Sequence, residues 1–134
     1  MAQTITKGYQ ALLDEANSIV NTISVDGAAA LLDSDKHVFI DLRDIREMQR
    51  AGKIPSAFSC PRGMLEFWID PASPYHKDLF NQDKTYIFYC ASAWRSALSA
   101  QQAQLMVLKP VVPIAGGLTA WAKAEKPTEA VERK

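Results

Sequence analysis

The stretch 87-IFYCASAWRSAL-98 places Cys90 directly after an apolar run and shortly before an arginine that opens a segment with helical spacing. The pattern predicts a buried strand, a tight loop and a helix. The small residues Ala91, Ser92 and Ala93 allow successive backbone N–H groups to turn inward and form an anion-binding nest. The stretch therefore raises the question of whether Cys90 is a nucleophile or a buried thiol.

The N-terminus of the helix predicted after this loop strengthens the anion site. It supplies unpaired N–H groups and the positive end of the helix dipole. Arg95 and the hydroxyl groups of Ser92 and Ser96 are further donors. Because helix N-termini and cations favour the ionised form of a thiol, we predict that Cys90 is a thiolate at neutral pH. A cysteine at a strand end is more often inert than catalytic, so the loop alone leaves both interpretations open.

Short apolar runs alternate with amphipathic segments along the rest of the chain. We expect strands at 37–42, 57–60, 85–89 and 111–114, and helices at 6–20, 25–33, 44–52, 64–69, 95–108 and around Trp121. This alternation predicts an α/β fold: a small, mainly parallel sheet flanked by helices on both faces, with an extra N-terminal helix. Such sheets bind ligands beyond the carboxyl ends of their strands, and Cys90 follows one of these ends.

The composition excludes several classes of protein. The 134 residues suit one domain, and 15 basic residues balance 15 acidic ones, so no basic field points to nucleic acid. No apolar run is long enough to span a membrane, and no secretory leader opens the chain, so we expect a cytoplasmic protein. Two cysteines and two histidines, without close pairing, favour neither a disulfide scaffold nor a metal site.

Three segments together resemble the motifs of one family. The loop CASAWRS resembles the active-site loop C-x-S-G-x-R-S of rhodanese-type sulfurtransferases. The segments 41-DLRDIREMQRAGKIPSAF-58 and 111-VVPIAGGLTAWAKAEKP-127 are similar to the first and the last motif of that family. We therefore expect a rhodanese-like domain at 24–127, preceded by a helical extension at 1–23 that packs on it and followed by a polar tail at 128–134.

The resemblance implies a sulfurtransferase that needs no cofactor. Cys90 would take a sulfane sulfur from a donor such as thiosulfate or a persulfide, and pass it to a thiol or to cyanide. Arg95 would hold part of the charge of the departing sulfite. The sulfur would lie in an anion-binding loop of Ala91, Ser92, Ala93, Trp94, Arg95 and Ser96. Related phosphatases and arsenate reductases have one more residue between cysteine and arginine, so the shorter loop here favours sulfur transfer.

Two loop residues depart from the family pattern. Ala91 occupies a position where several members that use thiosulfate carry arginine, which leaves open a sulfur carrier or partner-binding module with little thiosulfate turnover. Ala93 stands where glycine is usual, so either its φ is negative or strain is tolerated. The sequence identifies neither the donor nor the acceptor, and it leaves open a protein partner or a homo-oligomer.

Residues outside the loop have weaker functional indications. Arg62, Met64, Phe67 and Trp68 form either a pocket rim that selects the acceptor or a helical flap that only closes the core. We expect Cys60 to be a core residue rather than a partner of Cys90. We expect the turn between the strand at 37–42 and the helix at 44–52 to be fixed by the side chains of Asp41, Arg43 and Glu47.

Overall fold

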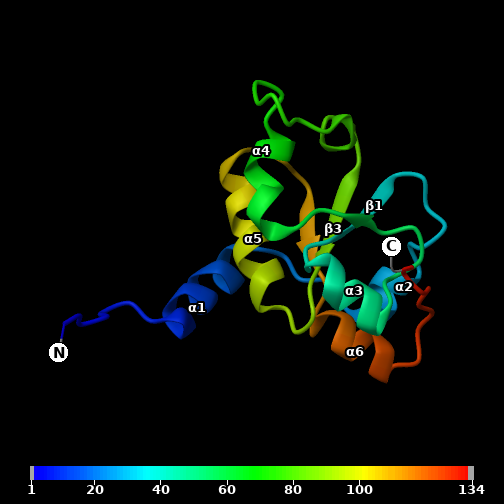
Figure 1. The fold of residues 1–134 in the computed structure, drawn as a ribbon, viewed down its shortest axis with the longest axis horizontal. Helices are drawn as coiled ribbons and strands as arrows, with labels where there is room; N and C mark the ends of the chain where they lie inside the picture. The colour runs from blue at the N-terminus through cyan, green and yellow to red at the C-terminus, as the bar shows by residue number, and fades with distance from the viewer. Residues whose placement is uncertain (1, 133–134) are drawn as a thin grey trace.

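The computed structural model describes residues 2–132 and contains a four-stranded parallel sheet (Figure 1). The strands are β1 (His37–Asp41), β2 (Phe58–Ser59), β3 (Thr85–Tyr89) and β4 (Val111–Pro113), in the order β2-β1-β3-β4. β1 pairs with β3 along its whole length, so that Asp41 lies opposite Tyr89. The two inner strands therefore end side by side at the same edge of the sheet.

Within residues 2–132, six α-helices accompany the sheet. They are α1 (Tyr9–Ile19), α2 (Val25–Ala29), α3 (Ile45–Ala51), α4 (Leu65–Ile69), α5 (Trp94–Leu105) and α6 (Gly117–Lys123), with 3₁₀ turns η1 (Arg62–Met64) and η2 (Asp78–Phe80). These helices are shorter than the ranges that the sequence predicts, most clearly α1, α2 and α5. After α2 the chain continues in i to i+3 turns, and after α5 it takes a left-handed conformation at Val107, with φ 68°.

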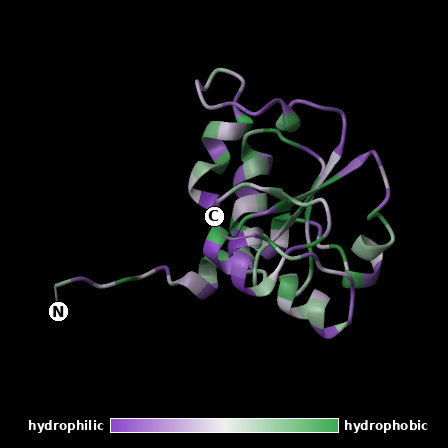
Figure 2. Cartoon of the chain, turned by 45° about the vertical axis from the view of Figure 1, so that its right-hand side comes forward, coloured by the Kyte–Doolittle hydropathy of each residue, from purple (hydrophilic) through white to green (hydrophobic). Residues whose placement is uncertain are grey.

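The helices cover both faces of the sheet, because consecutive strand residues point to opposite sides. On one face, Ile40 and Phe88 join a buried cluster with Leu65 of α4 and Ala100 of α5. The other face carries a second cluster, which contains Phe39, Ile87, Ala28 of α2, and Leu118 and Trp121 of α6. Figure 2 shows hydrophobic segments gathered in the middle of the body. The predicted α/β class with a small parallel sheet is confirmed.

The extra N-terminal helix packs against α5. Leu13 and Ala16 of α1 are buried with Ala97 of α5, and the ring of Tyr9 lies 5.0 Å from that of Trp94. The segment before α1 runs out from the body (Figures 1 and 2). The division of the chain at 23 and 127 stays a prediction. Within residues 2–132, no helix has both the length and the apolar character needed to cross a membrane.

Candidate active site

Cys90 lies at the carboxyl end of β3 with its sulfur directed at the start of α5. The residue is buried, and the backbone N–H of Ser96 donates a hydrogen bond to its Sγ at 3.4 Å. The Cys90 thiol in turn donates to Ser96 Oγ at 3.5 Å. If the thiol ionises, the Ser96 hydroxyl can rotate and donate to the sulfur. The first turn of α5 thus presents two donors to a thiolate at this position, because N–H groups at helix starts lack partners within the helix.

Helix α6 holds the loop from the outside. The N–H of Leu118 donates to the Cys90 carbonyl at 2.9 Å, and the N–H of Thr119 donates to the Ala91 carbonyl at 3.0 Å. In a trans peptide the N–H points opposite to the carbonyl, so the N–H groups of Ala91 and Ser92 point away from α6. The two carbonyls that would repel an anion are therefore turned outward, as an anion nest needs.

This close approach depends on the absence of a side chain at Gly117. Its φ is +62°, and a Cβ atom built there would lie 2.6 Å from the Cys90 carbonyl oxygen and 2.8 Å from that of Ala91. Both contacts are with backbone, which cannot move aside without moving the loop. Glycine at this position lets the start of α6 rest on the Cys90 loop.

Ala93 adopts a left-handed conformation, with φ 78° and ψ −5°, immediately before α5. A residue with a Cβ pays roughly 1–2 kcal/mol for this conformation relative to the right-handed one. Of the two readings that the sequence allowed, the structure shows the second: the backbone needs a positive φ here, and the strain is tolerated. The Ala93 carbonyl then accepts from the Ala97 N–H at 3.1 Å and starts the helix.

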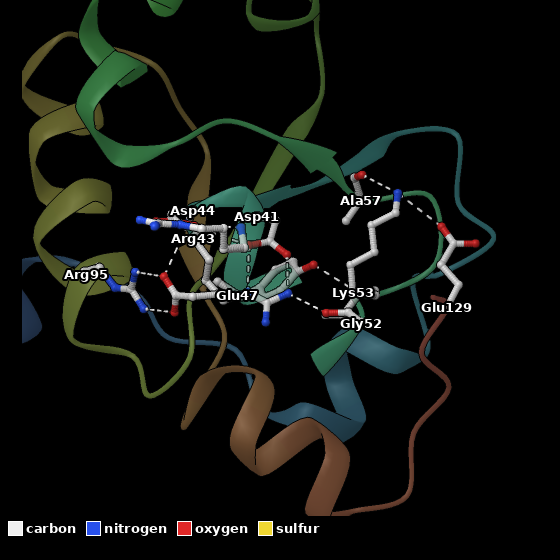
Figure 3. A network of polar contacts seen from close by, with 12 residues as sticks. Asp41, Arg43, Asp44, Glu47, Gly52, Lys53, Ala57, Arg95 and Glu129 are labelled. Atoms are coloured by element: carbon white, nitrogen blue, oxygen red, sulfur yellow. Dashed lines mark hydrogen bonds and ion pairs between the residues drawn. The ribbon is translucent and has the colours of Figure 1, made fainter. Parts of the chain in front are cut away.

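The guanidinium group of Arg95 is held by Glu47 of α3 (Figure 3). Its Nη1 and Nη2 atoms donate to the two carboxylate oxygens at 2.7 and 2.8 Å. Because of these bonds the pKa of Arg95 is raised and that of Glu47 is lowered from their ordinary values. We expected Arg95 to contribute donors to the anion site. The structure places one donor of each terminal nitrogen on Glu47, and Cys90 contributes a smaller part of the rise in the pKa of Arg95.

Sequence reasoning expected Glu47 only at the turn after β1 and missed its contact with Arg95. Glu47 sits at the third position of α3, where it also accepts a bond from the Asp44 N–H at 3.3 Å and completes a capping box. The capping role is the one that the sequence predicts for Glu47, and the contact with Arg95 was not anticipated. One signal was available in the sequence. Helix α3 starts just after β1 and α5 starts just after β3, and helices that follow neighbouring parallel strands start at the same edge of the sheet, where their side chains can meet.

A buried ion pair fixes the end of β1. Arg43 donates to both oxygens of Asp41 at 3.0 and 2.7 Å and to the Gly52 carbonyl at 2.7 Å (Figure 3). Its guanidinium carbon lies 5.8 Å from the centre of the Tyr89 ring, and the Tyr89 hydroxyl accepts from the Ile54 N–H at 3.1 Å. Burial raises the pKa of Tyr89. The pair locks β1, β3 and the end of α3 together, which is the structural role expected for Asp41 and Arg43.

A cavity of about 380 Å³ opens beside the loop at Ala91. Its lining comes from α3 and α6 besides the loop, and the residues are Arg43, Glu47, Arg50, Ala51, Ala91, Leu118, Thr119 and Ala122.

None of the four residues proposed as a pocket rim lines this cavity. Arg62 lines a different hollow, shared with Leu12 and Glu66. Phe67 is exposed, and Trp68 packs edge-on against Phe58. The structure therefore does not bring these residues together with Cys90 around one cavity. Met64 ends the turn η1 and is half-buried.

The remaining loop side chains point outward. Ser92 is exposed, and Trp94 is 55% exposed with its ring on Tyr9 of α1. The structure thus places Ser96 next to the Cys90 sulfur and pairs Arg95 with Glu47. The side chains of Ser92 and Trp94 point away from the sulfur. Among residues 2–132, no group of three His, Cys, Asp or Glu side chains could hold a metal ion.

The second cysteine lies in the core. Cys60 follows β2, its side chain is fully buried, and burial raises its pKa to about 12. The Cys60 N–H donates to the Asp41 carbonyl, and the Leu42 N–H donates to the Tyr89 carbonyl. The chain at Leu42 therefore lies between Cys60 and Cys90. Cys60 and Cys90 follow strands that are two positions apart in the sheet, a separation of about 9.5 Å. A disulfide spans at most roughly 7 Å between Cα atoms, so the two cysteines are too far apart to form one. Both thiols are free.

Replacing Ser96 by alanine should lower the rate at which Cys90 takes up sulfur by about tenfold, because one hydrogen bond to the charged sulfur is lost. The backbone N–H remains, so activity should not vanish. Ser99→Ala is the matched control, since Ser99 is equally buried on α5 and its hydroxyl has no hydrogen-bond partner within the described chain. Single-turnover sulfur uptake measures both variants, and equal rates for Ser96→Ala and wild type would contradict the assignment.

Fold and site define the class: an α/β domain whose cysteine loop lies at the carboxyl end of a parallel sheet, braced by two helix N-termini. The family model described as Rhodanese-like domain matches residues 24–124. The chain belongs to this family, which is a family of sulfurtransferases, and the resemblance of the three motifs is thereby confirmed.

Several solved structures are similar to this chain. A protein of unknown function from Rhodopseudomonas palustris, described as a possible tyrosine phosphatase, is 56% identical, covers 96% of this chain and 99% of its own, and has a TM-score of 0.93. A thiosulfate sulfurtransferase from Pseudomonas aeruginosa is 23% identical, with 94% of this chain and 23% of that one covered, and a TM-score of 0.77. A rhodanese-related protein from Thermoplasma volcanium is 20% identical, with 83% and 99% covered and a TM-score of 0.68.

The last two similarities concern the fold alone. A comparison with curated proteins gives no match.

Proposed function

We propose that this protein is a sulfurtransferase that carries sulfur as a persulfide on Cys90. The observation that carries the proposal is the position of the Cys90 sulfur. It lies at a strand end, it receives the Ser96 N–H from the first turn of α5, and the carbonyls of its loop are turned toward α6. Such a site stabilises negative charge on the sulfur, which both a thiolate and a terminal persulfide sulfur carry.

The reaction has two steps, and each breaks one sulfur–sulfur bond while the outer sulfur forms one new bond, to sulfur or, with cyanide as the acceptor, to carbon. The Cys90 thiolate attacks the outer sulfur of the donor and forms a new bond to it, while the bond inside the donor breaks and its electron pair leaves with the remainder of the donor. In the second step the acceptor, a thiolate or cyanide, attacks the outer sulfur of the persulfide. The Cys90 thiolate is then restored, and the chemistry needs no cofactor.

Two alternative functions for this site would give different experimental results in solution. A sulfur carrier would load its persulfide readily and turn over thiosulfate poorly, and it would deliver sulfur to a partner protein. A phosphatase is suggested by the description of the Rhodopseudomonas palustris protein. Against it stand the four residues between Cys90 and Arg95 and the carboxylate of Glu47 on Arg95, which would face a phosphate dianion. A cytoplasmic location is part of the proposal.

Intact-mass measurement after treatment with thiosulfate, and separately with cysteine hydropersulfide, tests the proposal. Wild-type protein should gain one sulfur atom with at least one donor, and Cys90→Ser should gain none. Cys60→Ala is the matched control, because it removes the other free thiol, and it should still take up sulfur. No gain in wild type with either donor, or an equal gain in Cys90→Ser, would overturn the proposal. Hydrolysis of 4-nitrophenyl phosphate that is lost in Cys90→Ser would instead indicate a phosphatase.

A further inference from the structure

We propose that α1 sets the reactivity of Cys90, with Leu13 and Tyr9 as positioning residues that act through the first turn of α5. This inference rests on the proposed function, since it concerns the cysteine that carries the sulfur. The family model matches residues 24–124, so α1 lies outside the matched part of the chain. Membership of the family therefore assigns no role to this helix.

The first turn of α5 carries two groups that are hydrogen-bonded to the Cys90 sulfur. The backbone nitrogen and the Oγ atom of Ser96 lie 3.4 and 3.5 Å from Cys90 Sγ. The turn is closed by the Ala97 N–H, which donates to the Ala93 carbonyl at 3.1 Å. Because a hydrogen bond to an ionised sulfur depends on the position of its donor, the sulfur ionises most readily when this turn is held in place.

Local interactions stabilise the start of α5 poorly. Its N-cap residue is Ala93, which has a left-handed φ of 78° and no side chain that can accept a hydrogen bond, and no acidic residue stands in the first turn. Ser24 and Asp44, in contrast, cap α2 and α3 with their side chains. The bond from Arg95 to Glu47 fixes one side chain of the turn. The backbone of the turn therefore depends on packing against other elements.

Helix α1 provides this packing at the start of α5 (Figure 1). Leu13 is 5% exposed and Ala16 is fully buried, and both pack against Ala97, the residue that closes the first turn. The ring of Tyr9 lies 5.0 Å from that of Trp94, the first residue of α5. The apolar contacts of α1 thus fall on the turn that presents hydrogen-bond donors to the sulfur.

The test is the pH profile of Cys90 alkylation by iodoacetamide in the full-length chain, normalised to its plateau at high pH so that differences in access cancel. Leu13→Ala leaves a cavity beside Ala97, and the first turn of α5 can then shift away from the sulfur. Because the hydrogen bonds to the thiolate weaken, the midpoint of the profile should rise by about 0.5–1 pH unit. Arg95 of α5 and Glu47 of α3 are the charged groups coupled to this site, and both keep their charge in this range because the pKa of Arg95 is raised and that of Glu47 is lowered.

Ile69→Ala is the matched control. Ile69 is 6% exposed and loses as many carbon atoms as Leu13 does on replacement by alanine. It lies at the opposite end of α5, where it lines a cavity with Met106 and Leu108. Urea unfolding should show a similar loss of stability in the two variants. The midpoint of alkylation in Ile69→Ala should stay within about 0.2 pH unit of wild type, because the atoms removed lie away from the first turn of α5.

Tyr9→Ala is a second variant, which decides the question should Leu13→Ala fail to fold. Tyr9 is 61% exposed, so its replacement should leave the urea midpoint almost unchanged. It removes the ring that lies against Trp94, and the midpoint of alkylation should rise by about 0.3–0.5 pH unit. Tyr75→Ala is the control, since Tyr75 is 62% exposed and lies outside α1 and α5. Its profile should match that of wild type.

Midpoints within about 0.2 pH unit of wild type in both Leu13→Ala and Tyr9→Ala would overturn the inference. Equal rises in Leu13→Ala and Ile69→Ala would do the same, because the reactivity of Cys90 would then follow the overall stability of the fold. Alkylation needs no sulfur donor. A failure of every donor to load Cys90 would therefore count against the proposed function, while the alkylation profile decides the role of α1.

Discussion

Gly117→Ala is expected to lower sulfur uptake by Cys90 about a hundredfold, because a displacement of about 1 Å in a reacting group has that effect. The added methyl group would overlap the Cys90 carbonyl oxygen, and the loop or α6 must shift to relieve the overlap. Together with the positive φ of the residue, the free energy of unfolding should fall by about 2–5 kcal/mol. Urea unfolding and single-turnover uptake measure the two effects.

Gly63→Ala is the matched control for this variant. Gly63 lies in the turn η1 at an ordinary φ, and a Cβ there would meet nothing within 4 Å. Its uptake and its unfolding free energy should equal those of wild type. Should Gly117→Ala also behave like wild type, the close packing of α6 on the loop would have no part in positioning Cys90.

Arg43→Met should lower the free energy of unfolding by about 3–5 kcal/mol, because the Asp41 carboxylate would remain buried without its partner. Both side chains of the pair are at most 2% exposed, so water cannot replace the lost bonds. Urea denaturation followed by tryptophan fluorescence, to which the buried Trp121 contributes, reports this loss.

The controls separate burial from the loss of a charge. Arg46→Met breaks the exposed pair with Asp44 on the same helix and should cost about 0–1 kcal/mol. The double variant Asp41→Asn with Arg43→Met removes both charges and should be more stable than Arg43→Met alone. A loss in Arg43→Met no larger than in Arg46→Met would contradict a structural role for the buried pair.

The sheet and the position of Cys90 could be predicted from the sequence because both depend on local patterns. The strands at 85–89 and 111–113 are short apolar runs, and the cysteine after the first of them must lie at the carboxyl edge. The residues of the capping box were likewise predictable, since Asp44 and Glu47 stand three positions apart in one helix.

The pairing of Arg95 with Glu47 could not be predicted in this way. These residues are 48 positions apart, and their contact depends on how far α3 and α5 are rotated about their axes, which packing decides. The position of the four residues proposed as an acceptor rim could not be predicted for the same reason. The sequence predicts a helix at 64–69, but whether its side chains face the cysteine depends on the docking of α4 against α5.

The contacts between α6 and the loop have a consequence for the order in which the protein acquires its reactivity. The carbonyls of Cys90 and Ala91 are oriented by residues that come more than twenty positions later in the chain. Beyond α6, the segment that includes Glu129 forms a bridge with Lys53 next to α3, and Trp121 donates to the Pro127 carbonyl at 2.7 Å. During synthesis the cysteine therefore leaves the ribosome well before the groups that orient its loop. We therefore expect the loop to reach the geometry seen here only after α6 has docked on it.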